Sequence, residues 1–360
     1  MLVKSKIYKR ISVLLIMLLS VSSLCASGGS GEALNPSDFI LGHVGDAYEW
    51  HITSIGDKHI SISLPIIVYT KEKGLNIFMS SHFHHGEHNG FFISHEDANK
   101  GKVVEINAQG EEIRPWDFSL TKNAASLLIS SALLILIVLY VAKWYKKDNM
   151  KAPTGFRGTI EMLIFFIYDD LIKPSVGKDY KKFAPYLLTV FFFIFFNNLL
   201  GLIPLFPGGA NVTGNIAITL FLALCTFLIT NFSGTKEYWK EIFWPDVPAW
   251  LKVPVPLMPV VEIVGILTKP FALMMRLFAN MLAGHMIVLV LTSLIFIFTA
   301  MMGVAVGAGV AVISIAFSIF MIMIDVLVCF IQAYVFTMLS AIFIGMARIE
   351  PHHQKHELNI

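Results

Sequence analysis

The chain has 360 residues, of which 56% are hydrophobic and 14% charged, and its mean hydropathy is +0.69. A soluble domain carries about 25% charged residues, so this composition indicates a membrane protein. The 27 Lys and Arg nearly cancel the 25 Asp and Glu, and a net charge of +2 excludes the cationic surface that nucleic-acid binding requires. The three scattered cysteines are too few for a disulfide framework or a zinc site.

Residues 1–26 have the order of a secretory signal peptide. Four basic residues and no acid are followed by the apolar run 11–19 and then by small residues that end at Ala26, where we expect cleavage. The alternatives are a short first membrane helix and lipid attachment at Cys25. The first alternative is disfavoured because the apolar run is too short to cross ~30 Å of hydrocarbon. Lipid attachment is disfavoured because Leu24 stands where a lipoprotein signal has a small residue.

Residues 27–118 differ from the rest of the chain, because they carry six basic and 13 acidic residues, a net charge of −7, and eight of the 12 histidines. Short apolar or alternating runs between Gly, Asn and Lys clusters predict a small exported domain with some β structure. Its role is open. A histidine tract predicts either a transition-metal site or a solvated, pH-responsive loop, and contains His82, His84, His85 and His88.

From residue 119 to 360 the sequence predicts an all-α polytopic membrane domain. Five charge-poor segments are long enough to cross the bilayer: about 124–142, 183–205, 213–235, 255–300 and 307–347. Residues of about 156–172 are too short and too charged to span, which predicts an amphipathic helix at the interface. The basic loops all fall on one side if the N-terminus lies outside and the C-terminus lies in the cytoplasm, as the positive-inside rule requires.

Five ionisable residues remain within residues 253–347: Glu262, Lys269, Arg276, His285 and Asp325. A charge at mid-membrane costs at least ~2.5 kcal/mol, so these residues are functional candidates. Arg276 stays protonated and has no acid within nine residues on either side. It therefore needs a counter-charge from another helix or from another protein.

Residues at equal depth in an antiparallel helix pair have numbers that add to a constant. The residue numbers of His285 and Asp325 add to 610, and those of Arg276 and Gln332 add to 608. Half of each sum gives the position of the turn, residue 304 or 305, and each pair then lies at one depth. An upright helix would hold Arg276 at ~43 Å from that turn, beyond the ~30 Å hydrocarbon core. The last two helices must therefore be tilted or bent.

These residues carry a resemblance to a known family. The run from Arg276 to His285, Arg-Leu-Phe-Ala-Asn-Met-Leu-Ala-Gly-His, together with the later Asp325 and Gln332, resembles the a subunit of the F-type ATP synthase. The segment around Asn198 is similar to the family's pre-turn segment. The resemblance covers roughly residues 119–350, and the first 118 residues resemble only the extended forms with a signal peptide.

The resemblance implies a proton-channel subunit of the bacterial inner membrane that is not catalytic by itself and needs no cofactor. Its implied partners are the c-subunit ring, the b-subunit peripheral stalk, the F1 sector and the lipid bilayer. Arg276 would face the ring and keep each passing carboxylate deprotonated between two offset half-channels. The implied proton path runs through Asn198, His285, Asp325 and Gln332 on the way in and past Glu262 on the way out, with Asn280 lining the same interface.

Three alternatives stay open beside that reading. In the best-known bacterial form the acid and the imidazole of His285 and Asp325 are exchanged, which leaves the order of proton transfer open. A sodium-driven synthase is a second possibility, because selectivity would be set mainly by the ring. The third is a metal-ion permease or sensor that captures its ion with the histidine tract, but it leaves Arg276 unexplained, since a fixed cation repels a metal ion.

Some candidates also have purely structural interpretations. Glu262 and Lys269 are seven residues apart on one helix face, where they would pair or snorkel to the interface. Asn198 and Gln332 would serve as hydrogen bonds between helices.

Overall fold

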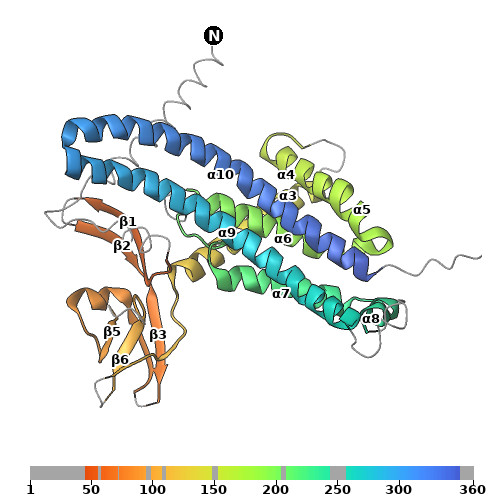
Figure 1. The fold of residues 1–360 in the computed structure, drawn as a ribbon, viewed down its shortest axis with the longest axis horizontal. Coiled ribbons are helices and arrows are strands. Elements are labelled where there is room, and N and C mark those ends of the chain that lie inside the picture. The colour runs from red at the N-terminus through yellow and green to blue at the C-terminus, as the bar shows by residue number, and fades with distance from the viewer. Residues whose placement is uncertain are drawn as a thin grey trace, which may run out of the picture. The chain divides into compact units, whose positions relative to one another are not determined.

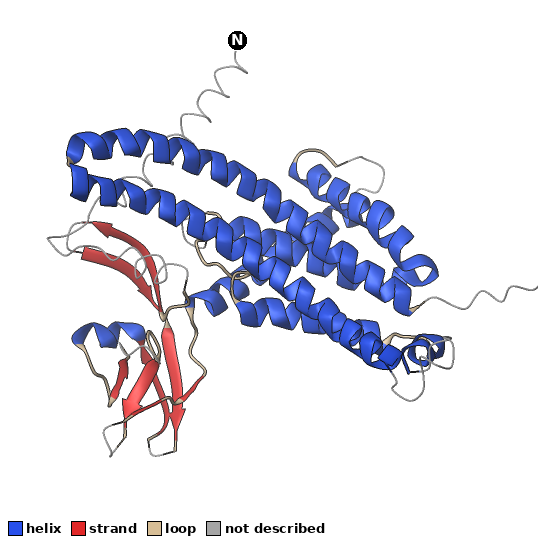
Figure 2. Ribbon diagram, viewed as in Figure 1, coloured by secondary structure: helices blue, strands red, loops and turns tan. Residues whose placement is uncertain are grey.

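The computed structural model confirms the predicted fold class, a helical membrane protein with small β-sheets near its N-terminus (Figures 1 and 2). It describes residues 45–55, 58–71, 73–94, 99–107, 111–147, 153–203, 208–243 and 257–348. The predicted signal peptide, residues 1–26, lies outside the described residues. The chain forms two compact units, one of Met1–Ile129 with Ile203–Ala210 and the other of Ser130–Leu202 with Asn211–Ile360.

The first unit contains short antiparallel strands, drawn red in Figure 2. They form three small sheets, β1-β2, β4-β3-β8 and β5-β6-β7, and their bounds are β1 Glu49–Ile55, β2 Lys58–Ser63, β3 Pro65–Thr70, β4 Gly74–Met79, β5 Phe91–Ile93, β6 Val103–Ile106, β7 Glu112–Ile113 and β8 Trp116–Asp117. A 3₁₀ helix, Ser80–His85, follows β4.

The core of this unit lies on one side of the β3 sheet, where Ile66 and Val68 are fully buried with Phe78 and Phe91. The Tyr48 hydroxyl donates a hydrogen bond to the Asp117 carboxylate beside this core. Burial, and then Asp117, raises the pKa of Tyr48. Buried residues alternate with more exposed ones along β3, the period of two of a strand with one face in a core, although its sequence is largely a continuous apolar run.

Four helical stretches are long and apolar enough to cross a membrane: Lys122–Lys146, Phe156–Gly201, Val260–Met302 and Ala305–Ala347, with the shorter apolar helix Ile216–Phe232 beside them. The first is α3, Lys122–Lys147. The second is divided into α4 Phe156–Phe165, a π-helical segment Phe166–Ile172, α5 Lys173–Val176, a 3₁₀ turn Gly177–Asp179 and α6 Tyr180–Gly201.

The predicted interfacial helix of residues 156–172 is therefore extended in the structure to Val176. Gly177 ends it with a φ of 76°, a left-handed value that favours glycine. The π-helical segment contains the adjacent acids Asp169 and Asp170. The hydropathy of the sequence did not predict a π-helical segment here.

The remaining helices are α7 Ile216–Phe232, α8 Lys236–Phe243, α9 Leu257–Met302 and α10 Val304–Ala347. The last two pack against each other as one long hairpin, and α6 and α7 pack beside them (Figure 1). At ~1.5 Å per residue, 46 residues of α9 extend ~69 Å, about twice the hydrocarbon thickness. The reversal is at Gly303, with φ 85°, one residue before the predicted turn.

Candidate functional site

Arg276 lies on a surface-exposed face of α9, although the helix around it is apolar. Small residues share this face at helical spacing, because Ala272, Ala279 and Ala283 are exposed as well. No acidic side chain lies within ion-pair distance of Arg276 in the part of the chain that the structure describes. The guanidinium is thus available to a carboxylate on another molecule that approaches closely.

A small cavity between α9 and α10 brings three of the predicted site residues together. Asn280, His285 and Asp325 line it, and its volume of about 10 Å³ is close to that of a single water site. The remaining lining residues are Leu202, Met281, Gly284 and Val328. His285 of α9 and Asp325 of α10 thus line the same cavity, which agrees with their matching depths in the hairpin.

The absence of a side chain at Gly284 allows this approach. A Cβ atom at Gly284 would lie 3.0 Å from Oδ1 of Asp325, so the carboxylate rests almost directly on the backbone of α9. Asp325 is 8% exposed, and its Oδ2 accepts no hydrogen bond within the described residues. A buried carboxylate oxygen in that state favours a bound proton or a water molecule in the cavity.

Two other inlet candidates, Asn198 and Gln332, are buried but do not line this cavity. Gln332 is 7% exposed on α10. Asn198 on α6 is fully buried, and its Oδ1 accepts a 2.6 Å hydrogen bond from the Thr213 hydroxyl, while its Nδ2 has no acceptor among described residues. The adjacent Asn197 accepts a 2.8 Å hydrogen bond from Ser130 of α3. Asn198 therefore has one structural hydrogen bond and one buried donor left over.

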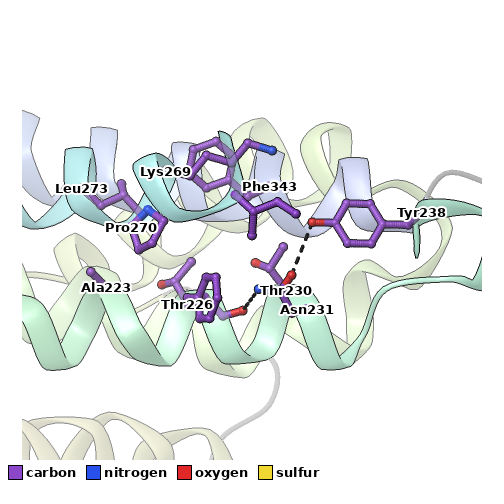
Figure 3. A pocket seen from close by; sticks show the side chains of 11 residues that line it. Ala223, Thr226, Thr230, Asn231, Tyr238, Lys269, Pro270, Leu273 and Phe343 are labelled. Atoms are coloured by element: carbon purple, nitrogen blue, oxygen red, sulfur yellow. Dashed lines mark hydrogen bonds between the residues drawn. The ribbon is translucent and has the colours of Figure 1, made fainter. Parts of the chain in front are cut away.

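A second cavity, of about 20 Å³, lies where α7, α8, α9 and α10 meet (Figure 3). Apart from Lys269, its polar lining residues were not identified from the sequence. Tyr238 of α8 donates a 3.5 Å hydrogen bond to Oδ1 of Asn231, and the Asn231 amide donates a 2.8 Å bond to the Phe227 carbonyl. The full lining is Ala223, Thr226, Phe227, Thr230, Asn231, Tyr238, Ile266, Lys269, Pro270, Leu273 and Phe343.

Pro270 removes one backbone hydrogen bond of α9 beside this cavity. Proline has no backbone N–H, so it cannot donate to the carbonyl of Ile266 four residues earlier, and both residues line the cavity. The Thr230 hydroxyl is also buried without a partner among the described residues. Both groups can bind a water molecule there.

Glu262 lies near this second cavity without lining it. Glu262 precedes Ile266, which lines the cavity, by one turn of α9. Burial, and then the Glu262 carboxylate, raises the pKa of Tyr238. Within the described residues Glu262 makes no ion pair with Lys269, whose Nζ lies 5.5 Å from the ring centroid of Phe343. Lys269 therefore contributes to the cavity wall and does not neutralise Glu262.

The two cavities occupy separate stretches of α9, and Arg276 lies between them. The second cavity reaches Leu273 and the first begins at Asn280, a separation of seven residues or ~10 Å along the helix. Leu273, Met274 and Leu277, all buried, fill that interval. Along α9, one water-sized space thus lies on each side of Arg276, and buried apolar residues separate the two spaces.

The histidine tract of the first unit was a candidate metal site. The rings of His82 and His88 lie 4.5 Å apart, and Nδ1 of His82 lies 3.1 Å from the carbonyl of Met79. The side chains of His84 and His85 are outside the described residues. No group of three His, Cys, Asp or Glu side chains that could hold a metal ion occurs within the described part of the chain, so nothing supports the metal-permease alternative.

The residues that sequence reasoning missed are the polar groups of α7 and α8. Thr219, Thr226 and Thr230 are buried and recur at spacings of seven and four, which marks one polar stripe on an otherwise apolar helix. The spacing of these threonines was the sequence pattern from which the polar face of α7 could have been predicted. Thr226 lies 2.8 Å from the Tyr186 hydroxyl and 3.3 Å from that of Ser340, so it links α7 to α6 and α10.

Comparison with known proteins gives two family matches. Residues 125–345 match the family model described as ATP synthase A chain. Residues 39–118 match a separate model, described as a domain of unknown function, DUF8433. The second match ends where the strands end and the first begins within α3.

Curated relatives agree with the first match. The chain is 41% identical over 249 residues to ATP synthase subunit a of Chloroherpeton thalassium, with 67% of this chain and 70% of that protein covered. It is 44% identical over 262 residues to ATP synthase subunit a 2 of Chlorobaculum tepidum, with 71% and 70% covered. For ATP synthase subunit a of Myxococcus xanthus the identity is 42% over 245 residues, with 66% and 75% covered.

Proposed function

The chain belongs to the family of the ATP synthase A chain, or subunit a, and from this premise we propose how its own residues conduct protons. It is the multi-pass, proton-channel subunit of the synthase's membrane sector and therefore a component of an enzyme complex. In our proposal the subunit performs no ATP chemistry. It guides protons to a rotating partner and leaves catalysis to the F1 sector.

The observation that carries the proposal is the position of Arg276 between two polar cavities. A guanidinium does not lose its proton, so it attracts a passing carboxylate in the ionised state and cannot itself relay a proton. A carboxylate of the c ring that reaches Arg276 releases its proton to one cavity and takes up another from the other cavity. The apolar interval of Leu273, Met274 and Leu277 prevents water from joining the two directly.

We assign the inlet to the cavity of His285 and Asp325. An imidazole and a carboxylate at one level exchange a proton through a single water, and the Asp325 oxygen without a partner is suited to hold it. Asn198 supports the outer part of the route, and Gln332 and Asn280 support its passage to the ring. The exchanged positions of acid and imidazole keep such a pair intact, whichever group receives the proton first.

We assign the outlet to the cavity beside Glu262. Its threonine, asparagine and tyrosine side chains, with the Ile266 carbonyl to which Pro270 cannot donate, support a short water chain. Glu262 then accepts the proton near the mouth of the cavity. The phenol of Tyr238 keeps its own proton at neutral pH and serves as a hydrogen-bonding wall.

The remaining assignments concern partners and placement. The face with Arg276 and its flanking alanines contacts the c ring, because small residues permit a helix of the ring to approach closely. The b-subunit stalk and the F1 sector are the other partners. We place the protein in the inner membrane with residues 27–118 outside, after removal of a signal peptide of residues 1–26, and with the C-terminus in the cytoplasm.

Replacement of Arg276 by Ala tests the central assignment. Without the cation, ring carboxylates stay protonated or exchange protons across both cavities, so ATP-driven acidification of inverted membrane vesicles should be abolished. Arg157→Ala is the matched control, since it removes a guanidinium that lies over the Tyr140 ring, away from both cavities. Acidification that persists at the wild-type rate in Arg276→Ala, with normal assembly, would show the assigned role to be wrong.

A further inference from the structure

The first unit has an exposed apolar sheet face that the proton path does not use. On the β4-β3-β8 sheet, the pairing register aligns two rows of side chains, and the six residues are Leu75, Tyr69, Trp116, Ile77, Ile67 and Phe118. Trp116 is 70% exposed, Phe118 and Ile77 are each 65% exposed, and Leu75 is 61% exposed. A contiguous patch of this kind marks an interaction surface rather than scattered surface residues.

The patch itself contains no charged side chain. None of the six side chains is charged, although residues 27–118 carry a net charge of −7. The opposite face of the same sheet holds the buried core residues Ile66 and Val68. Lys71 and Arg114, each two residues along the chain from Tyr69 and Trp116, are exposed at the end of the patch. An uncharged aromatic surface with a basic rim matches the boundary between lipid headgroups and acyl chains.

Hydrogen bonds join this face to the start of a membrane-spanning helix. The Phe118 amide donates to the Ile67 carbonyl at 2.9 Å, the Leu120 amide to Pro65 at 3.1 Å, and the Lys122 amide to Ala47 at 2.8 Å. Helix α3 begins at Lys122, so only three residues lie between Phe118 and the helix, and four steps of extended chain span ~13 Å. The sheet is thus held at the membrane by the chain itself.

We propose that this sheet face lies on the phospholipid surface through which α3 enters the bilayer. Tyr69 and Trp116 sit at headgroup level, Ile77 and Phe118 reach the upper acyl region, and Lys71 with Arg114 contacts lipid phosphates. The contact depends on apolar and aromatic insertion, because the acidic remainder of the unit is repelled by anionic lipids. The inference does not depend on the proton path.

Spin-label accessibility in the complete chain tests this proposal. Ile77→Cys and, as a matched control, Glu87→Cys are each introduced after the three native cysteines are replaced by alanine. Glu87 is exposed on the same unit but does not belong to the patch. Both proteins are labelled with a nitroxide and reconstituted, with the assembled synthase, into vesicles of phosphatidylethanolamine and phosphatidylcholine.

The label at residue 77 should collide more with oxygen, which concentrates in lipid, than with a water-soluble nickel chelate, and the label at residue 87 should show the reverse preference. If both labels favour the nickel chelate, the face is in water and the proposal is wrong. If the label at residue 77 is shielded from both agents, the face is covered by protein, such as another subunit or a second copy of this chain, and the proposal is equally wrong.

Discussion

The contact between Asp325 and Gly284 determines how the pair of His285 and Asp325 is built. An ordinary side chain at residue 284 would separate α10 from α9 at this level, and the carboxylate would then have no room beside the helix backbone. Glycine costs the helix roughly 0.5–1 kcal/mol relative to alanine, and α9 accepts that cost at a point where proton transfer needs a close approach. The position of Asp325 beside His285 therefore depends on the missing side chain of Gly284 as well as on charge.

Gly284→Ala should slow proton transport several-fold while the complex still assembles. The new methyl group would lie 3.0 Å from Oδ1 of Asp325, so the carboxylate must move by a few tenths of an ångström and its alignment with His285 is lost. Gly265→Ala, on the same helix with nothing within 4 Å of the added atom, is the control. Dye-reported acidification of inverted vesicles measures both, and equal rates in the two variants would contradict the spatial argument.

At the scale of elements, α10 organises the second unit by packing against α9, α6, α7 and α5. Near its end, the Arg348 guanidinium forms an ion pair with Asp179 and donates a 3.3 Å hydrogen bond to the carbonyl of Ser233, which ties α10 to the start of α6 and the end of α7. Gly345, one turn earlier, contacts the backbone of α5. The interfacial helix is held to the bundle by this approach.

Gly345→Ala should destabilise the subunit by about 1–3 kcal/mol, the usual cost of overpacking. Its Cβ atom would lie 2.1 Å from the Ser175 carbonyl oxygen, a distance that only a shift of the backbone can relieve. Gly309→Ala on the same helix meets no atom within 4 Å and should be neutral or slightly stabilising. Thermal unfolding of the detergent-solubilised subunit compares the two, and indistinguishable midpoints would refute the close contact.

At the scale of the whole molecule, most of the helices could be predicted from the positions of charged residues and from the lengths of the apolar runs between them. Runs without charge located α3, α6 and α7 because hydrocarbon excludes ionised groups, and the regular rise of a helix let residue numbers alone bring His285 opposite Asp325. The pairing of β3 with β8, nearly fifty residues apart, has no local signal. The cavity of Asn231 and Tyr238 was also hidden, because it requires four helices to meet.

Orientation is testable on the same scale with a membrane-impermeant maleimide. Glu87→Cys and Lys240→Cys both place a thiol at an exposed position outside the spanning helices. Because basic loops stay in the cytoplasm, the thiol at residue 87 should react in spheroplasts and the thiol at residue 240 only in inverted vesicles. The opposite pattern would reverse the proposed topology, and reaction of both thiols in spheroplasts would require an even number of crossings between them.

The single-residue reversal at Gly303 makes the lengths of α9 and α10 a constraint on sequence change. One residue inserted into either helix between the reversal and the cavity would rotate everything beyond it by about 100° and slide it by ~1.5 Å. His285 would then no longer meet Asp325, even though every side chain were unchanged. Insertions and deletions in this hairpin should therefore be tolerated far less than substitutions, and any that survive should come in compensating pairs on both sides of Gly303.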